Sequence, residues 1–429
     1  MSQNRIYLCL AHMSEAGMEQ KYVKEAFDTN WVVPLGPNVN GFEADLKEFV
    51  TEVKSEECKV KSVLTSKEVV ALASGTSAVH LALLACGVGP GDEVIVQSFT
   101  FCASSNPITY LGATPVFVDS EKETWNIDPE LMEEAIKDRI AKTGRKPKAI
   151  VPVALYGMPY QMDRIMEIAD RYGIPVIEDA AEGFGSRFGG RVLGTFGEYG
   201  VLSFNGNKMI TTSGGGALIC PDMEAKNKIM WYATQAREAY PYYQHEAIGY
   251  NYRMSNVCAG IGRGQMTIVD DHIGHHRHVA QLYKEAFAEV KGIAFHDEME
   301  GMMSNFWLST ILLDEDLKVK GEELAYAEAV NGAVGGAAGM VHGGGSVHTD
   351  CEPNRNVEAM RMALDKEGIE SRPLWKPMHK QPVYKHAPAY VNGVSEGLFK
   401  RGLCLPSGPY VKDDDVKRII ETIINSIEG

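Results

Sequence analysis

Between about residues 70 and 220, short apolar runs rich in β-branched residues alternate with longer segments that repeat apolar residues at helical spacing. Runs that are apolar on both faces are typical of buried parallel strands. Such runs occupy residues 92–98, 114–120, 148–155 and 174–180. The helical segments 129–144 and 160–173 lie between strands and end at glycine. The pattern predicts an α/β fold with an open, mostly parallel sheet and helices on both faces, which binds ligands beyond the carboxyl ends of its strands.

Beyond residue 220 the strand pattern weakens. Residues 258–290 are predicted to form one long helix that leads into a smaller C-terminal α+β domain, so we place the domains at 1–265 and 266–429. Residues 331–350 are rich in glycine and alanine and predict a mobile loop. The charged stretch at 51–70 is predicted to add either a helical turn or a loop.

Charge and cysteine usage narrow the functional classes. The 429 residues carry a formal net charge of −15 and contain no run of lysine and arginine, which disfavours nucleic acid or an anionic membrane surface as the main partner. Neither a signal-peptide core nor an apolar segment of about 20 residues is visible. The eight cysteines show no CxxC spacing, so we expect reduced thiols, no disulfide and no zinc site. These features predict a cytoplasmic enzyme.

Gly75, Thr76 and Ser77 stand at the start of an apolar-periodic segment, which predicts a helix beginning there. The free amides and the positive dipole end of a helix favour phosphate binding. The same residue types are also typical of an ordinary N-cap. Both interpretations of this motif stay open.

Two acids, Glu178 and Asp179, stand where a predicted strand ends, and Glu182 follows closely. A carboxylate at such an edge can pair with a cationic ring nitrogen, as pyridine-based cofactors require. The alternative is an acidic first turn of a helix, which the helix dipole stabilises.

Residues 197–220 predict a strand, an irregular polar turn that contains Lys208, a glycine-rich connection and another apolar strand. A lysine becomes nucleophilic when desolvation or a nearby cation eases its deprotonation, which favours a secluded position of this kind. The alternative is a solvated lysine in a surface turn.

Several motifs in one order resemble the DegT/StrS sugar-nucleotide aminotransferases. These motifs are "PLGPNVNGFEADLKEFV" (34–50), "SGTSAVHLAL", "QSFTFCASSNPITYLGATPVFVD", "IEDAAEGFGS", "SFNGNK", "GYNYRMSN", "GIESRPLWKPMH" and "CLPSGPYVKDDDVKRII". The resemblance implies the type I, aspartate aminotransferase fold of enzymes that depend on pyridoxal 5'-phosphate (PLP). It also implies a ping-pong reaction that moves an amino group from glutamate to a nucleotide-linked keto sugar, such as a 4-keto-6-deoxyhexose, in the synthesis of polysaccharide precursors.

The resemblance implies catalytic roles for three residues. Lys208 would bind PLP covalently and move a proton between the cofactor's methylene carbon and the substrate carbon. Asp179 would pair with the ring nitrogen, and Glu182 would lie beside the phenolic oxygen.

Five further residues are implied in cofactor binding. The amides of Gly75 and Thr76 and the hydroxyl of Ser203 would hold the phosphate, and Phe101 would stack on the ring. Asn251 would reach the phosphate of the cofactor in a neighbouring subunit, which makes the implied functional unit a homodimer.

Residues 371–384 resemble the family's substrate-side segment. Arg372, Trp375, Lys376 and His379 are therefore candidates to line the sugar and diphosphate, and a cationic and aromatic set suits an anionic nucleotide sugar. Without the resemblance, the same stretch predicts a proline-punctuated loop with an aromatic anchor.

Competing interpretations remain. A PLP-dependent sugar dehydratase would share most motifs, but the C3-deoxygenating group has histidine in place of the lysine, so Lys208 argues against it. A non-enzymatic regulator would need a DNA-binding pattern, and none is visible. His272 and His276 have metal-ligand spacing without a third ligand, so no metal is expected. The glycines of 185–200 predict a hairpin or turn rather than a dinucleotide site.

Overall fold

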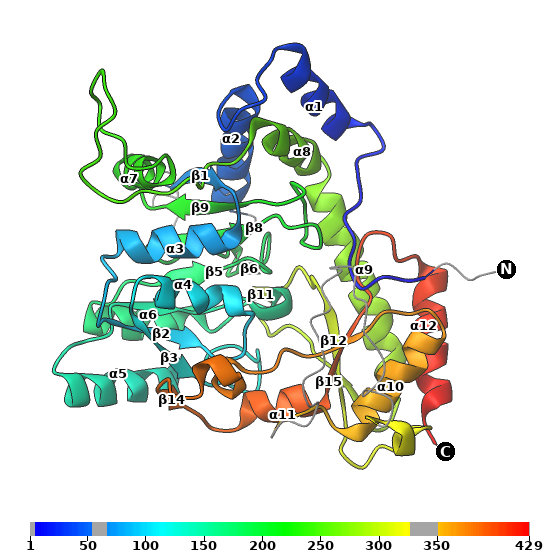
Figure 1. Cartoon of the computed structure of the whole chain (residues 1–429). Coiled ribbons are helices and arrows are strands. Elements are labelled where there is room, and N and C mark those ends of the chain that lie inside the picture. Colours follow the sequence, from blue (N-terminus) through cyan, green and yellow to red (C-terminus); the bar gives the residue numbers. More distant parts are fainter. Residues whose placement is uncertain (1–4, 54–66, 327–350, 429) are drawn as a thin grey trace.

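The computed structural model describes residues 5–53, 67–326 and 351–428 (Figure 1). Residues 331–350 and most of the charged stretch 51–70 lie outside these ranges. Among the described residues, no helix combines the length and the apolar character needed to cross a membrane.

A large, mostly parallel sheet forms the centre of the molecule (Figure 1). Its two four-stranded halves are joined by parallel bridges from Ile150 to Val176 and from Val153 to Asp179. The strand order is β1 (Glu68–Leu72), β9 (Gly216–Cys220), β8 (Tyr199–Ser203), β5 (Ile177–Asp179), β4 (Ala149–Val151), β2 (Glu93–Gln97), β3 (Thr114–Val118) and β14 (Ala389–Tyr390). Only β9 runs antiparallel to its neighbours. The α/β fold with a mostly parallel sheet is therefore confirmed.

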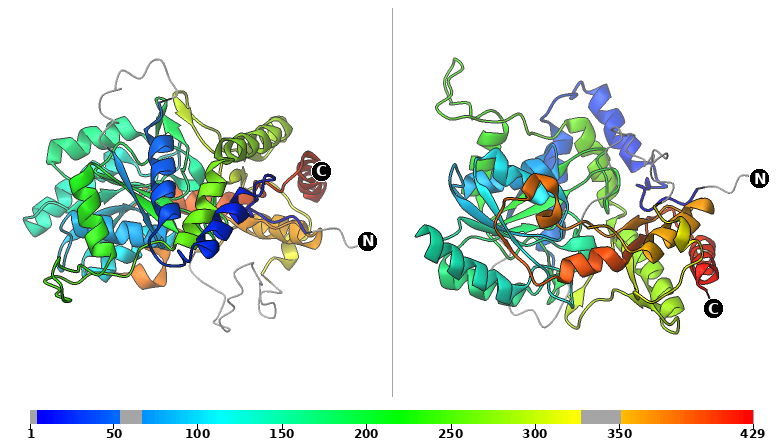
Figure 2. Two further views of the ribbon diagram at one scale, coloured as in Figure 1. Left: turned by 90° about the horizontal axis from the view of Figure 1, so that it is seen from above. Right: turned by 60° about the horizontal axis from the view of Figure 1, so that its bottom comes forward.

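Helices cover both faces of this sheet, as predicted (Figure 2). Alternate residues of β1 show the division: Val70 and Leu72 pack into one core cluster, and Val69 and Ala71 pack into the other. The first cluster includes residues of α3 (Gly75–Ala85), α4 (Asn106–Tyr110) and α7 (Met223–Ala233). The second includes residues of α2 (Pro37–Thr51), α5 (Pro129–Thr143) and α6 (Met162–Tyr172). Burial on both faces explains why these strands are apolar throughout.

A smaller antiparallel sheet lies beside the large one (Figure 2). It contains β10 (Ile293–Phe295), β12 (Ser309–Leu313), β15 (Gly402–Leu405) and β13 (Arg372–Pro373), in that order. Residues of α9 (Val269–Phe287), α10 (Arg355–Lys366) and α12 (Asp413–Ser426) share its apolar core. The remaining α-helices of the described residues are α1 (Met18–Asp28), which packs against α8 (Asn256–Met266), and α11 (Val394–Arg401).

The predicted single helix over 258–290 is wrong. The structure has two helices, α8 and α9, which are separated by Thr267 and Ile268. Both the amide and the hydroxyl of Thr267 donate to the carbonyl of Gly264, at 3.1 Å and 2.6 Å. Ile268 then leaves helical geometry with φ −128°. The Thr267 side-chain bond accompanies the end of α8, and sequence periodicity does not reveal it.

Residues 185–200 do form the predicted hairpin. β6 (Arg187–Phe188) pairs with β7 (Arg191–Val192), and β11 (Met302–Met303) extends this small sheet. Gly189 and Gly190 both have positive φ, at 54° and 76°, which two-residue hairpin turns require.

The domain boundary at residues 265 and 266 stays a prediction. The chain returns from the C-terminal side to the large sheet, because β14 pairs in parallel with β3 at its edge. The amide of Phe117 donates to the carbonyl of Pro388, and the amide of Asp119 donates to the carbonyl of Tyr390, both at 2.9 Å.

Candidate active site

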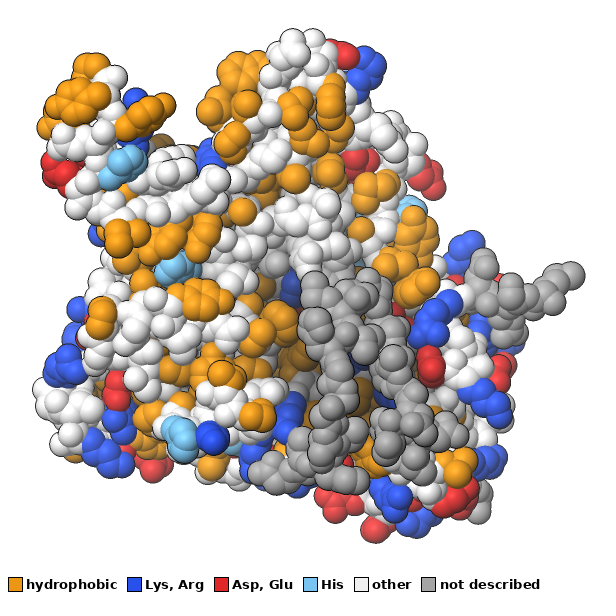
Figure 3. Space-filling model, viewed as in Figure 1, with side chains coloured by type: hydrophobic (Ala, Val, Ile, Leu, Met, Phe, Trp, Pro, Cys, Tyr) orange, Lys and Arg blue, Asp and Glu red, His pale blue; other side chains and the backbone are white. Residues whose placement is uncertain are grey.

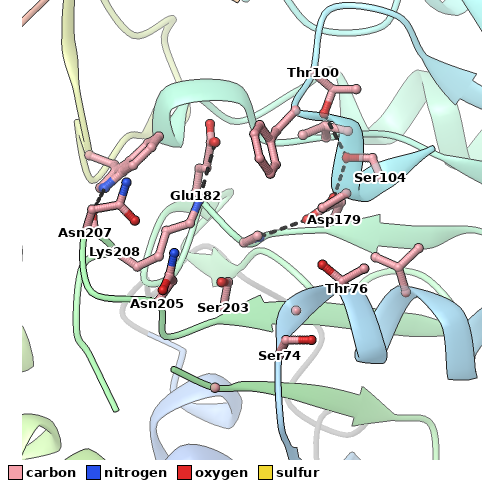
Figure 4. A pocket seen from close by; sticks show the side chains of 18 of the residues that line it. Ser74, Thr76, Thr100, Ser104, Asp179, Glu182, Ser203, Asn205, Asn207 and Lys208 are labelled. Atoms are coloured by element: carbon pink, nitrogen blue, oxygen red, sulfur yellow. Dashed lines mark hydrogen bonds and ion pairs between the residues drawn. The ribbon is translucent and has the colours of Figure 1, made fainter. Parts of the chain in front are cut away.

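A cavity of about 320 Å³ lies at the carboxyl end of the large sheet (Figure 4). It is bounded by the N-terminus of α3, the segment after β2, the end of β5 and the turn after β8. Among its lining residues are eight of the sequence-predicted candidates: Gly75, Thr76, Phe101, Asp179, Glu182, Ser203, Lys208 and Trp375. These residues come from five separate parts of the chain, so the fold and not local sequence brings them together.

The N-terminus of α3 opens into one side of this cavity. Ser74 is the N-cap, and its hydroxyl accepts from the Ser77 amide at 3.0 Å. The amides of Gly75 and Thr76 lie in the first turn, where a helix offers no internal acceptor. Ser203, at the end of β8, lies beside them. The motif thus contains a cap and, next to it, donors suited to a phosphate.

Two glycines allow this close approach. A Cβ on Gly75 would lie 3.1 Å from the Cβ of Ser203, which is tighter than ordinary packing. A Cβ on Gly216, in β9, would collide with the amide nitrogen of Gly75. Only residues without side chains let β9 pass directly beneath the start of α3.

Asp179 is a buried acid at the end of β5 (Figure 4). One of its oxygens accepts from the Ser104 hydroxyl at 2.6 Å, and the other accepts from the Ala181 amide at 3.1 Å. Burial raises the pKa of Asp179 above its usual value, although these two hydrogen bonds and the charge of Lys208 oppose the rise. The negative charge of this carboxylate is therefore only partly compensated, and a cation placed against it would be stabilised.

Glu178 precedes Asp179 but has a structural role. Because successive side chains of a strand point to opposite faces, its carboxylate faces away from the cavity. It accepts from the amides of Gly194, Phe196 and Gly197 at 2.6–2.8 Å and from the Tyr160 hydroxyl at 2.6 Å. Glu178 holds the turn that follows the hairpin.

Lys208 lies inside the cavity, not in a solvated turn. Its side chain is 14% exposed, and its Nζ lies 3.4 Å from Oε1 of Glu182. The same Nζ lies 4.2 Å from the ring centroid of Trp307. The turn after β8 thus directs a lysine amine between a buried carboxylate and an indole face.

Glu182 is fixed by a strained backbone segment. Its second oxygen accepts from the Tyr156 amide at 2.8 Å, and Tyr156 adopts a left-handed conformation with φ 56°. Burial raises the pKa of Glu182, opposed by the charge of Lys208 and by the Tyr156 amide. Non-glycine residues in this conformation cost energy and are concentrated at functional sites.

Sequence reasoning missed three residues that line or support the site. Trp307 lies under Lys208, and its indole nitrogen donates to the carbonyl of Asn207 at 2.7 Å. Ser104 supports Asp179, and its hydroxyl lies 2.8 Å from that of Thr100. Tyr156 supports Glu182, and its hydroxyl accepts from the Trp375 amide at 2.8 Å. No local pattern marks these residues, because each acts through a partner far away in the sequence.

Four predicted residues are not among those lining the cavity. The Arg372 guanidinium lies 3.0 Å from the Glu370 carboxylate. Lys376 belongs to the same segment and also does not line the cavity. His379 is half-buried, with Nδ1 2.7 Å from the Ser98 hydroxyl. Asn251 is exposed and forms an antiparallel bridge with Thr234.

The histidine pair of α9 is buried against the site's backbone. Nδ1 of His272 lies 3.1 Å from the carbonyl of Met209, and Nδ1 of His276 lies 3.1 Å from that of Phe306. Burial lowers the pKa of His276 to about 3. Within residues 5–53, 67–326 and 351–428, no three histidine, cysteine, aspartate or glutamate side chains converge as a metal would need.

Known proteins resemble this chain in sequence and in fold. A model described as the DegT/DnrJ/EryC1/StrS aminotransferase family matches residues 14–334 and 344–424. EpsN of Bacillus subtilis, whose name includes pyridoxal phosphate-dependent aminotransferase, is 42% identical over 98% of this chain and 95% of its own length. The GDP-perosamine synthase of Escherichia coli O157:H7 is 34% identical over 97% of this chain and 98% of its own. A family aminotransferase from Brucella abortus has a TM-score of 0.79 and 28% identity, with 96% of this chain and 95% of that chain covered.

Proposed function

Because this chain belongs to the DegT/DnrJ/EryC1/StrS aminotransferase family, we propose that it moves an amino group from glutamate to the C4 ketone of a nucleotide-linked 6-deoxyhexose. The chain is a PLP-dependent sugar aminotransferase. The donor, the nucleotide and the position of the ketone are part of the proposal. The observation that carries it is the seclusion of the Lys208 amine beside Glu182, in one cavity with Asp179 and the start of α3.

The chemistry of the cavity fits PLP. Its phosphate matches the free amides of Gly75 and Thr76 and the hydroxyl of Ser203, and a protonated pyridine nitrogen matches the buried carboxylate of Asp179. An aldehyde carbon suits the amine of Lys208. The glycine contact between β9 and α3 keeps the anion-binding amides open to the cavity.

When bound, PLP supplies an electron sink for the pair of electrons left on a substrate carbon that loses its proton. In the proposed reaction Lys208 Nζ would take that proton as a general base and return it as a general acid at the cofactor carbon bonded to the same amino nitrogen. Asp179 keeps the ring nitrogen protonated, and Ser104 holds the Asp179 carboxylate in place through its 2.6 Å hydrogen bond. The seclusion of Lys208 excludes bulk water from the amine.

Aromatic side chains form the substrate side of the cavity. The rings of Phe101 and Trp375 have centroids 5.4 Å apart, and Trp375 stacks on Tyr156 at 6.3 Å with an interplanar angle of 14°. We propose that Phe101 and Trp375 contact the cofactor ring and the sugar. Arg372, Lys376 and His379 would bind the diphosphate further from the cofactor. The similarity to GDP-perosamine synthase supports a nucleotide-linked sugar as substrate.

The presence of lysine at position 208 favours transfer over dehydration. The dehydratase alternative depends on a histidine in place of this lysine, and the structure directs an amine into the cavity.

The proposed substrate is tested with a panel of sugars. Protein loaded with PLP and glutamate is offered UDP-, GDP- and dTDP-linked 4-keto and 3-keto sugars, and release of 2-oxoglutarate is followed. With glutamate as donor, we expect release of one 2-oxoglutarate for each molecule of one nucleotide-linked 4-keto-6-deoxy sugar that is converted. Turnover of 3-keto sugars alone would contradict the C4 assignment, and no turnover with any sugar would contradict the whole proposal.

A homodimer is also part of the proposal. Figure 3 shows apolar side chains on the protruding loop beyond α7 and on the connection between α1 and α2. Tyr243 and Ile248 in the loop are 78% and 82% exposed, and Trp31 and Leu35 in the connection are also exposed. Neighbouring apolar patches of this kind mark protein interfaces. Asn251 follows the loop and would therefore lie close to the second subunit.

Sedimentation should give a mass twice the 47.1 kDa of one chain, and a monomer would contradict this assembly.

A cytoplasmic location completes the proposal. Six cysteines in the described parts of the chain are present as thiols: Cys9, Cys86, Cys102, Cys220, Cys258 and Cys404. Free thiols are expected of proteins in reducing compartments.

A further inference from the structure

We propose that Asn305 is a positioning residue, which holds both Glu182 and Trp307 against the amine of Lys208. This inference rests on the proposed function, because it assigns a purpose to the neighbours of the residue that binds PLP. Asn305 lies between β11 and β12, outside the large sheet, and its side chain does not line the cavity.

The side chain of Asn305 connects two segments that meet at the site. The residue is 0% exposed. Its Nδ2 donates to the carbonyl of Glu182 at 2.8 Å and to the carbonyl of Phe184 at 2.9 Å. Its Oδ1 accepts from the amide of Trp307 at 2.8 Å. The side-chain amide of Asn305 thus fixes the backbone of both Glu182 and Trp307, which are 125 residues apart in the sequence.

These two residues are the neighbours of the Lys208 amine. Glu182 Oε1 lies 3.4 Å from Nζ, and the Trp307 ring centroid lies 4.2 Å from it. The Trp307 indole also donates to the carbonyl of Asn207, the residue before Lys208. A carboxylate and an aromatic face both stabilise a positive charge at such distances. The position of Asn305 therefore influences the charge on the Lys208 nitrogen without contact with it.

The backbone around Asn305 is shaped to this arrangement. Phe306 has a left-handed φ of 46°, and its amide donates to the Ser304 hydroxyl at 3.0 Å. A Cβ on Gly157, which has φ 94°, would collide with Oδ1 of Asn305. Gly157 directly follows Tyr156, whose amide holds the Glu182 carboxylate. Strained conformations on both sides of the contact persist because Asn305 and its partners determine them.

The titratable groups around the Lys208 amine are Glu182, Asp179 and the thiol of Cys9. Burial raises the pKa of Cys9 to about 12, so the thiol is neutral. Asn305 is uncharged. A change in the protonation behaviour of the site after substitution of Asn305 would therefore arise from displaced neighbours and not from a lost charge.

The test uses the visible absorption of the PLP-loaded protein, titrated with pH. In Asn305→Ala all three side-chain bonds are lost, and we expect the pH midpoint of the band to fall by about one unit, because the positive charge loses its two stabilising neighbours. Asn305→Ser retains a hydroxyl that can accept from the amide two residues on, but it loses both bonds to the segment of Glu182 and Phe184. Its midpoint should fall by a smaller amount.

Asn356 on α10 provides a matched control. It is also a buried asparagine whose Nδ2 donates to two backbone carbonyls, those of Asp314 and Leu317 at 2.9 Å and 3.0 Å. Its helix neighbours Val357 and Met360 belong to the core cluster of the smaller sheet, and Asn356 does not line the cavity that holds Lys208. Asn356→Ala should lower the melting temperature as Asn305→Ala does and leave the pH midpoint unchanged.

The outcomes separate this inference from the proposed function. A wild-type protein without a visible band that depends on Lys208 would overturn the proposed function itself. A normal wild-type band, with an Asn305→Ala midpoint equal to that of Asn356→Ala, would overturn only the role of Asn305. If Asn305→Ala does not fold, the pH midpoint of Asn305→Ser is compared with that of Asn356→Ala. A lower midpoint in Asn305→Ser supports the role of Asn305, and an equal midpoint overturns it.

Discussion

Lys208→Ala is expected to lower the rate of amino transfer by at least about a thousandfold and to remove the visible absorption of the PLP-loaded protein. The reason is that this amine, 14% exposed and 3.4 Å from the Glu182 carboxylate, is the proton carrier of the proposed mechanism. Borohydride reduction of the loaded wild-type protein, followed by peptide mass spectrometry, should place the cofactor on Lys208.

Lys226 offers the control for this experiment. It is also a partly buried lysine with carboxylates nearby, since its Nζ lies 3.5 Å from both Glu43 and Glu68. Lys226 lies on α7, and it does not line the cavity. Lys226→Ala should retain the reduced cofactor on Lys208. Recovery of the label on another lysine would remove the basis of the proposed mechanism.

Asp179→Asn is expected to lower the rate of amino transfer by about a hundredfold or more, with a smaller change in PLP affinity. Asparagine has nearly the same shape, but it carries no charge to keep the ring nitrogen protonated. Single-turnover measurements of the half-reaction with glutamate would show the loss directly. The same substitution should raise the melting temperature of the cofactor-free protein, because burial already raises the pKa of Asp179 and its charge is poorly compensated.

Glu178→Gln, one residue earlier, is the corresponding control. The Glu178 carboxylate accepts from three amides and the Tyr160 hydroxyl and faces away from the cavity. Its loss should lower the melting temperature and leave the single-turnover rate within a few-fold of wild type. A rate that falls equally in both variants would show that the Asp179 effect is structural.

Much of the large sheet could be predicted because local pattern and fold agree there. α5 and α6 end where Gly144 and Gly173 adopt positive φ, as the glycine stops indicated. The strands are apolar because helices cover both faces. The break between α8 and α9 escaped prediction because Thr267 and Ile268, and not a proline or glycine, separate the two helices.

The site was predictable only in part, for a related reason. Asp179, Ser203 and Lys208 follow strand ends, so their meeting at one edge of the sheet follows from topology. Trp307 and Asn305 come from an irregular segment next to β12, and only tertiary packing places Trp307 beside Lys208 and Asn305 beside Glu182. The roles implied by resemblance for Asn251, Arg372, Lys376 and His379 remain predictions, and the substrate panel and sedimentation address them.

The strand β14 has a consequence for how the protein is synthesised. Within the described residues, the outer edge of β3 pairs with residues 389 and 390, and Ile6 bridges to Ile369. A ribosome must therefore release most of the chain before the large sheet gains its last strand and the N-terminal segment finds its partner. Until then the exposed edge of β3 is available for incorrect pairing with other nascent chains. A gene shortened by its last 41 codons ends before β14 and should yield aggregates rather than a smaller working enzyme.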